Sequence, residues 1–224
     1  ATDDCRPPRR MPEWPAMHTP DLFADERPDA GLREPLGAQA VVLRAYALPM
    51  LPGLWHTLQQ LTAASPFRIM QTAGGRHMSA ALSSCGSLGW VSDTFGYRYA
   101  ARDPHTGQPW PAMPQELLQL GRQAAAEAGF AAFTPDTCLI NRYLPGARMG
   151  LHQDRHERDF RQPIVSVSLG LPAVFLFGGL TRDAAVQRVP LFHGDVVVWG
   201  GVDRMRFHGV LPVKPGQHPL LGAQ

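Results

Sequence analysis

Two histidines and one aspartate have the residue types and the spacing of a metal site. His152 and Asp154 are two positions apart, and His208 lies in a later segment of the chain. Alternate residues of a β-strand point to the same face, so the first two side chains are predicted to share a face. Two imidazoles and one carboxylate hold iron(II) in non-haem iron oxygenases and leave coordination positions open. Zinc accepts the same ligands, so the residue types alone do not choose between the metals.

A simpler interpretation of these residues is that they bind nothing. A His-x-Asp triplet often occurs by chance, and a lone histidine is usually a hydrogen-bonded residue of the core or the surface. The surrounding sequence favours the metal site, because the first pair follows the turn residues Pro145 and Gly146, and His208 follows the clearest strand pattern of the chain. The third ligand must come from another strand, and a jelly roll brings two such strands together.

The composition predicts one globular domain in a reducing compartment. The chain has 224 residues, of which 44% are hydrophobic and 18% charged, and its net charge of +2 is too small to indicate a nucleic-acid partner. Cys5, Cys85 and Cys138 are far apart and match neither a zinc motif nor a disulfide framework. The apolar stretch 167–180 is too short to span a membrane, and no signal peptide is visible. We therefore expect a cytoplasmic protein without membrane association. Nothing in the sequence suggests a dimer, so a monomer is expected.

The first half of the chain is predicted to contain an arm and two helices. Residues 1–20 are rich in proline and arginine and are expected to form a disordered arm, so that a single domain spans 21–224. Residues 51–64 carry apolar side chains at helical spacing, and 114–128 begin with proline and end before a glycine, so both segments are predicted helices. A short strand is expected at 41–43.

Residues 65–111 combine glycine turns with spaced aromatic residues. Their alternating pattern predicts hairpins rather than helix. Two interpretations are open at this point: a lid over a site, or a β-meander whose aromatic side chains fill a core. The aromatic residues concerned are Trp90, Phe95, Tyr97, Tyr99 and Trp110.

From residue 137 onward the pattern is one of short strands separated by turn residues. The strands are predicted at 137–143, 149–154, 164–169, 173–177, 189–192, 195–199 and 204–210. Strands at this spacing are typical of a sandwich or barrel. The predicted fold is mainly β with flanking helices: a jelly roll at 137–224, buttressed by the N-terminal helices, with residues 65–111 near its mouth.

Several longer motifs in this order resemble the bacterial AlkB family. They are Leu139-Ile140-Asn141-Arg142-Tyr143, Leu151-His152-Gln153-Asp154, Ile164-Val165-Ser166-Val167-Ser168-Leu169-Gly170, His193-Gly194-Asp195-Val196-Val197-Val198-Trp199-Gly200-Gly201 and His208-Gly209. The resemblance runs from about residue 21 to the end of the chain. It implies a double-stranded β-helix that uses iron(II), 2-oxoglutarate and O2 to remove alkyl groups from nucleic-acid bases, with 65–111 as a nucleotide-recognition lid.

The resemblance also implies roles for individual residues. It assigns iron to His152, Asp154 and His208, and it places 2-oxoglutarate at three residues of the preceding strand: Asn141, Arg142 and Tyr143. An amide and a phenol can donate hydrogen bonds to the carboxylates of that cosubstrate. Trp90 matches the aromatic residue that stacks on the damaged base, opposite the His152 ring. Nucleotide contacts are implied at Tyr97, Arg98, Tyr99 and Arg182, and phosphate contacts are expected at Arg148 and Arg155. Phe95 and Trp110 can still be packing residues.

The activity implied is oxidative demethylation of 1-methyladenine and 3-methylcytosine in single- or double-stranded DNA, or in RNA, with release of formaldehyde and succinate. These lesions block base pairing, so the base is easily extracted from the stack, and its positive charge favours an aromatic slot. Two alternatives are a 2-oxoglutarate oxygenase that acts on protein or small molecules, and a non-catalytic binder of methylated nucleic acid.

The sequence departs from the family pattern in two places. His156 stands where the best-known member has an acidic residue that contacts the base, so His156 is a candidate for base preference. The family also has a strand with the pattern Arg-x5-Arg after the last ligand, and the chain ends where that strand is expected to begin. We therefore expect the final strand of the jelly roll to be missing, and with it an arginine that grips 2-oxoglutarate.

Overall fold

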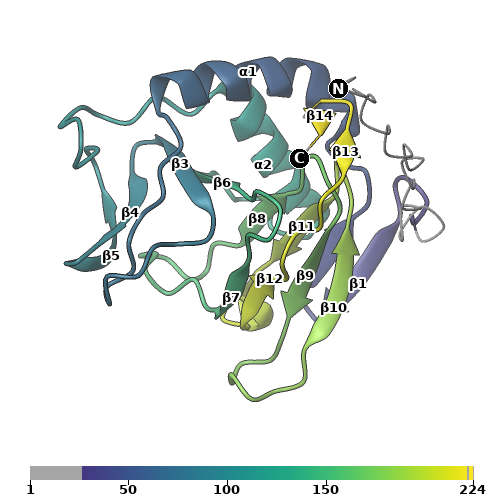
Figure 1. Cartoon of the computed structure of the whole chain (residues 1–224). Helices are drawn as coiled ribbons and strands as arrows, with labels where there is room; N and C mark the ends of the chain where they lie inside the picture. The colour runs from purple at the N-terminus through teal and green to yellow at the C-terminus, as the bar shows by residue number, and fades with distance from the viewer. Residues whose placement is uncertain (1–26, 221, 224) are drawn as a thin grey trace, which may run out of the picture.

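Two four-stranded antiparallel sheets face each other in the computed structural model, which describes residues 27–220 together with 222 and 223. The first sheet has the order β1 (Arg33–Gly37), β2 (Ala40–Leu43), β11 (Val196–Trp199) and β8 (Ile164–Val167). The second has the order β10 (Gln187–Leu191), β9 (Ala173–Phe177), β12 (His208–Val210) and β7 (Met149–His152). The pairing of strands distant in the chain confirms the jelly roll (Figure 1). The arm predicted at 1–20 lies outside the described residues.

Strand β11 explains how the core is divided into two layers. Its four residues are all buried, but alternate side chains point to opposite faces of the sheet. Val197 and Trp199 pack between the two sheets, against Phe175 and Phe177 of the second sheet. Val196 and Val198 pack on the other side, under the helices. A strand covered on both faces has a continuous apolar sequence, which is why this segment gives the clearest strand pattern in the chain.

Two helices cover the outer face of the first sheet (Figure 1). They are α1 (Leu51–Ala64) and α2 (Gln115–Glu127). Leu54, Leu120 and Ala124 are buried against the sheet, as the helical spacing of apolar residues predicts. Gly129, with a φ of +93°, follows the end of α2 in a backbone conformation that glycine adopts without strain. The helical buttress is therefore confirmed, with boundaries within one residue of those predicted.

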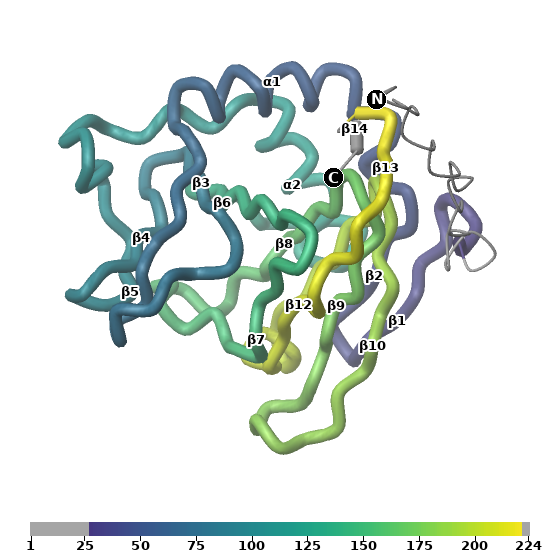
Figure 2. Tube along the Cα trace, in the orientation of Figure 1, coloured from purple at the N-terminus to yellow at the C-terminus, as the bar shows by residue number. Residues whose placement is uncertain are grey.

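The aromatic segment before α2 forms strands, as predicted. The strands pair as β3 (Ala81–Gly86) with β6 (Thr137–Arg142), and β4 (Gly89–Asp93) with β5 (Gly96–Ala100). The β4–β5 hairpin lies at the left of the molecule, beyond β7 (Figure 2). Trp110 is a packing residue: its ring is buried and its Nε1 donates to the Ala100 carbonyl. The interpretation of Phe95 as a packing residue is wrong, because its side chain is 90% exposed.

Two strand boundaries near the predicted ligands differ from the prediction, and one strand was not predicted. Strand β7 ends at His152, so Asp154 lies beyond the strand and not within it. Strand β12 begins at His208, because the residues before it form a short 3-10 helix, η2 (Gly201–Asp203), and a turn. Strand β1 was not predicted, since its sequence mixes charged residues with proline and glycine. It forms because its backbone pairs with the apolar strand β2.

The end of the described chain forms a small antiparallel pair, β13 (Gln217–His218) and β14 (Gly222–Ala223). One further 3-10 turn, η1 (Leu48–Met50), leads into α1. Within the part of the chain that the structure describes, no helix is both long enough and apolar enough to cross a membrane.

Candidate active site

His152, Asp154 and His208 come together at the ends of neighbouring strands. His208, the first residue of β12, lies opposite His152, the last residue of β7, and their ring centroids are 4.3 Å apart. The Asp154 carboxylate faces both rings, with its oxygens 3.6 Å from Nε2 of His152 and 3.4 Å from Nε2 of His208. One ligand atom from each residue lies within 4.8 Å of the others. The three donor atoms therefore surround a space suited to one metal ion.

Hydrogen bonds to the backbone orient both imidazoles. Nδ1 of His152 lies 2.9 Å from the Gly150 carbonyl, and Nδ1 of His208 lies 3.1 Å from the Arg206 carbonyl. A carbonyl can only accept, so each Nδ1 carries a proton, and each Nε2 faces Asp154. Metal-binding histidines are usually held in this way by a group behind the ring. The ring orientation thus fits a metal that is bound through Nε2.

The electrostatics of His152 and Asp154 also fit a metal. Burial and the nearby His208 lower the pKa of His152. Burial raises the pKa of Asp154, but the hydrogen bond with His208 and the charges of the two histidines outweigh it, so the net pKa lies below its ordinary value. At neutral pH the site therefore offers a neutral imidazole and a carboxylate. Metal ligands must be in these deprotonated forms.

Two residues that the sequence did not suggest hold Asp154 in place. Arg204, only 2% exposed, donates from Nη1 to the Asp154 carbonyl at 2.9 Å. Its Nη2 forms an ion pair with Glu157 at 3.2 Å. Buried charged groups of this kind require a partner, but the sequence carries no signal of which carboxylate that partner is.

Asn141 lies on β6 and Tyr143 directly follows that strand; both were predicted to meet the cosubstrate. Oδ1 of Asn141 is buried without a hydrogen-bond partner among the described residues, which is unusual unless a ligand or water satisfies it. An amide can rotate to present its NH2 group instead. Burial, and then the charge of Asp154, raise the pKa of Tyr143 to about 12, so its phenol remains a donor. Both groups fit a ligand that carries carboxylates.

Arg142 lies apart from this pair. Alternation along β6 turns it to the opposite face, where its guanidinium lies 4.4 Å from the centroid of the Phe67 ring. The side chain is exposed and borders an open pocket beside α1. This position gives no support to the prediction that Arg142 binds the cosubstrate.

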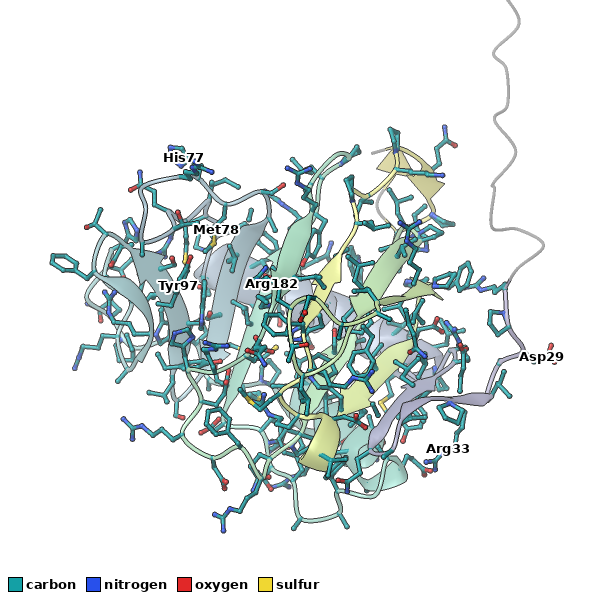
Figure 3. All side chains as sticks on the ribbon, turned by 90° about the horizontal axis from the view of Figure 1, so that it is seen from below. Asp29, Arg33, His77, Met78, Tyr97 and Arg182 are labelled. Atoms are coloured by element: carbon teal, nitrogen blue, oxygen red, sulfur yellow. The ribbon has the colours of Figure 1, made fainter. Side chains whose placement is uncertain are left out.

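Two tyrosines of the β4–β5 hairpin contact the segment that follows Asp154. Trp90 and Tyr97 stack on each other, with ring centroids 5.6 Å apart and planes 23° apart. Tyr97 also approaches the ring of His156 at 5.7 Å. Because His156 is two residues from Asp154, the hairpin and the metal ligands border one region. The side-chain view shows Tyr97 on the hairpin (Figure 3).

The remaining residues predicted to contact the nucleotide occupy different surroundings. Arg98 donates two hydrogen bonds of 2.8 Å to Asp93 of the same hairpin. The Tyr99 hydroxyl donates to Glu157 at 2.8 Å. Arg182 is exposed on the loop between β9 and β10, on the side seen from below (Figure 3), and its guanidinium lies 5.0 Å from the Phe207 ring. The side chains expected at phosphates, Arg148 and Arg155, are both exposed.

Comparisons with known proteins agree with this geometry. Residues 51–224 match the family model described as the 2OG-Fe(II) oxygenase superfamily. The chain is 54% identical to the alpha-ketoglutarate-dependent dioxygenase AlkB of Salmonella typhimurium, over 90% of this chain and 92% of that protein. It is 53% identical to the protein of the same name from Escherichia coli, over 89% and 91% of the two chains.

A solved structure agrees as well. The structure of OsALKBH1 superimposes with a TM-score of 0.73 at 25% identity, covering 84% of this chain and 91% of the other. The family match, the identity along nearly the whole chain and the clustered ligands lead to one conclusion. The protein is a member of the AlkB family within the 2OG-Fe(II) oxygenase superfamily.

Proposed function

We propose that this protein removes methyl groups from 1-methyladenine and 3-methylcytosine in DNA or RNA, and that formaldehyde and succinate are released. As a member of this family, it uses iron(II), 2-oxoglutarate and O2. The observation that carries the proposal is the position of the stacked pair Trp90 and Tyr97, which borders the same region as the His-Asp-His cluster. An oxygenase for small molecules or proteins has no evident use for such a pair.

The metal and the cosubstrate have defined places in this proposal. His152, Asp154 and His208 would hold the iron, and Asn141 and Tyr143 would donate hydrogen bonds to 2-oxoglutarate. When bound, the iron and 2-oxoglutarate supply the oxidation of the methyl carbon, after which the methyl group leaves as formaldehyde. The chemistry belongs to the cofactor, and the protein supplies ligands, orientation and exclusion of water. No side chain is required as a nucleophile.

The aromatic pair selects the substrate in two ways. A base that is to be modified must leave the helical stack, and one that cannot pair is the least costly to extract. Methylation at the ring nitrogen also makes these bases cationic, and a cation between aromatic faces gains a cation–π attraction. We assign the stacking face to Trp90, whose ring is packed against Tyr97, and the edge of the base to His156, which Tyr97 approaches.

The phosphate contacts are proposed from exposed arginines. Arg148, Arg155 and Arg182 are exposed, whereas Arg98 is held by Asp93. Phosphate contacts position a nucleic acid without reading its sequence. They are consistent with an enzyme that recognises a lesion rather than a sequence.

One assay separates the proposal from its alternatives. The protein is incubated with iron(II), ascorbate, 2-oxoglutarate and an oligonucleotide that contains 1-methyladenine or 3-methylcytosine, and formaldehyde is measured. A gel shift without iron runs beside it, and Asp154→Asn is the inactive control. Formaldehyde release supports the demethylase. Binding without formaldehyde indicates a non-catalytic binder, and the absence of both favours an oxygenase for other substrates.

A further inference from the structure

The segment 153–163, here called the ligand loop, joins β7 to β8 without forming helix or strand. It carries Asp154 and His156, which makes its conformation decisive for the active site. The hydrogen bonds of a sheet fix the two histidines, which lie within β7 and β12. No such ladder fixes Asp154, so side chains packed against the ligand loop must determine where its carboxylate lies.

Arg204 makes most of these contacts. Its guanidinium donates to the Asp154 carbonyl at 2.9 Å and to the Gln162 carbonyl at 3.0 Å, near the two ends of the ligand loop. It forms an ion pair with Glu157 at 3.2 Å and lies 5.5 Å from the Phe160 ring. A planar guanidinium with five donors can hold several acceptors in fixed directions, which the point charge of a lysine cannot. Arg204 therefore holds the ligand loop near both of its ends, an arrangement here called the clamp.

Glu157 extends this clamp to the β4–β5 hairpin. Its second oxygen accepts a hydrogen bond of 2.8 Å from the hydroxyl of Tyr99. Burial, and then the charge of Glu157, raise the pKa of that phenol, so it remains a donor at neutral pH. Tyr99 on β5 lies directly opposite Trp90 on β4. A continuous series of polar contacts thus runs from the strand pair that carries the stacking residue to the backbone of a metal ligand.

We propose that Arg204, Glu157 and Tyr99 are positioning residues that couple the recognition hairpin to the metal ligand Asp154. Arg204 sets the position of the Asp154 carboxylate. The contact between Tyr99 and Glu157 holds the β4–β5 hairpin against the ligand loop. The part that concerns the substrate rests on the demethylase function proposed above. The part that concerns the metal does not, because it requires only that the three ligands bind a metal.

Two variants test the metal end and the hairpin end of this series of contacts separately. Arg204→Lys keeps the charge but loses the fixed fork, so metal affinity is expected to fall about 10- to 100-fold, as is usual when a group supporting a ligand is changed. Tyr99→Phe removes one hydroxyl. It is expected to leave metal affinity within about 2-fold and to raise the KM for the methylated oligonucleotide about 3- to 10-fold, the effect of one lost hydrogen bond. It should also increase the amount of succinate formed per formaldehyde. A base that is poorly positioned is not oxidised in every turnover that consumes 2-oxoglutarate.

The matched control is Tyr46→Phe, which removes a hydroxyl near the core under the helices, away from the ligand loop. All variants are compared by thermal melting, by Mn(II) affinity from equilibrium dialysis, and by KM, kcat and the succinate-to-formaldehyde ratio. A higher KM and ratio in Tyr99→Phe alone, with weaker Mn(II) binding in Arg204→Lys alone, support the proposal. If Tyr99→Phe matches Tyr46→Phe in every readout while wild type is active, the coupling is wrong.

The outcomes also separate this proposal from the proposed function. If wild type releases no formaldehyde, the demethylase function fails, and the Mn(II) affinity of Arg204→Lys still decides the metal part. Unchanged Mn(II) affinity in a folded Arg204→Lys protein contradicts the clamp. If Arg204→Lys does not fold, the comparison of Tyr99→Phe with Tyr46→Phe decides the proposal.

Discussion

His208 lies directly across from His152 in the β12–β7 pair, although the two residues are far apart in the chain. This register places both Nε2 atoms beside the Asp154 carboxylate, at 3.4 and 3.6 Å. Because side chains alternate along a strand, a slip of one residue would turn a histidine to the other face. The core residue Phe175, whose ring centroid lies 6.1 Å from that of His208, packs beside this pair. The fold and the metal site are therefore specified by the same strand pairing.

The carboxylate of Asp154 is expected to be essential for metal binding. Asp154→Asn removes the negative charge and leaves an amide of almost the same shape. We expect Mn(II) affinity to fall more than about 100-fold, beyond the usual effect of changing a supporting residue, and formaldehyde release to be lost. Asp29→Asn is the matched control, since Asp29 is exposed at the opposite edge of the molecule from Tyr97 (Figure 3). Equal metal affinity in the two variants would remove Asp154 from the ligand set.

The ring of Trp90 is expected to contribute to nucleic-acid affinity and not to metal affinity. Stacking of a base on an aromatic side chain is worth about 1–3 kcal/mol. Trp90→Ala should weaken binding of a methylated oligonucleotide by that amount, and the loss should be smaller for the unmethylated oligonucleotide, which lacks the cationic base. Fluorescence anisotropy measures both affinities. Unchanged affinity for the methylated oligonucleotide, with unchanged Mn(II) binding, would exclude the stacking role.

His156 is expected to influence which base is preferred. Its ring approaches Tyr97 at 5.7 Å, two residues after Asp154. His156→Asp introduces a carboxylate that can accept a hydrogen bond from the amino group of the base. We expect the ratio of kcat/KM for 1-methyladenine to that for 3-methylcytosine to change about 2- to 10-fold, the range of one hydrogen bond. A ratio equal to that of wild type would place His156 outside the pocket.

The ion pair between Arg68 and Asp103 is expected to make stability depend on pH in acid. Asp103 is 5% exposed, and its Oδ1 accepts a bond of 2.7 Å from Arg68. This contact lowers the pKa of Asp103 from 3.8 to about 2. A carboxylate whose pKa is depressed on folding stabilises the protein above its unfolded pKa, and that contribution is lost as the pH falls through the folded value. The difference corresponds to about 2 kcal/mol.

The measurement for this ion pair is urea unfolding at several pH values. Between about pH 5 and pH 2, wild type should lose about 2 kcal/mol more than Asp103→Asn, which has no carboxylate to protonate at that position. Parallel stability curves for the two proteins over this range would contradict the assignment. The variant should be less stable than wild type at pH 7, where the pair is fully formed.

The layers of the fold could be predicted because they depend on periodic burial. The helices α1 and α2 and the strand β11 each bury a regular set of side chains, and their sequences repeat at the matching period. The ligands could be predicted because few residue types bind metals. Asp154 was nevertheless placed in a strand that ends at His152, since the sequence does not show where backbone pairing stops.

What could not be predicted depends on contacts between distant segments. Nothing in the local sequence indicates that Arg204 pairs with Glu157, because one buried charge does not identify its partner. The same holds for Cys85 and Cys138, which seemed unrelated by spacing but lie directly opposite each other on β3 and β6. For Phe95 the sequence left packing open as one interpretation, but its side chain is 90% exposed between β4 and β5.

The most direct test of the central claim is a crystal structure of the protein with Mn(II) and 2-oxoglutarate, with anomalous data collected at the manganese edge. We predict one manganese ion bound by Nε2 of His152, Nε2 of His208 and the carboxylate of Asp154, with 2-oxoglutarate beside Asn141 and Tyr143. A manganese peak elsewhere, or a bound ion that lacks any one of these three ligands, would contradict the account.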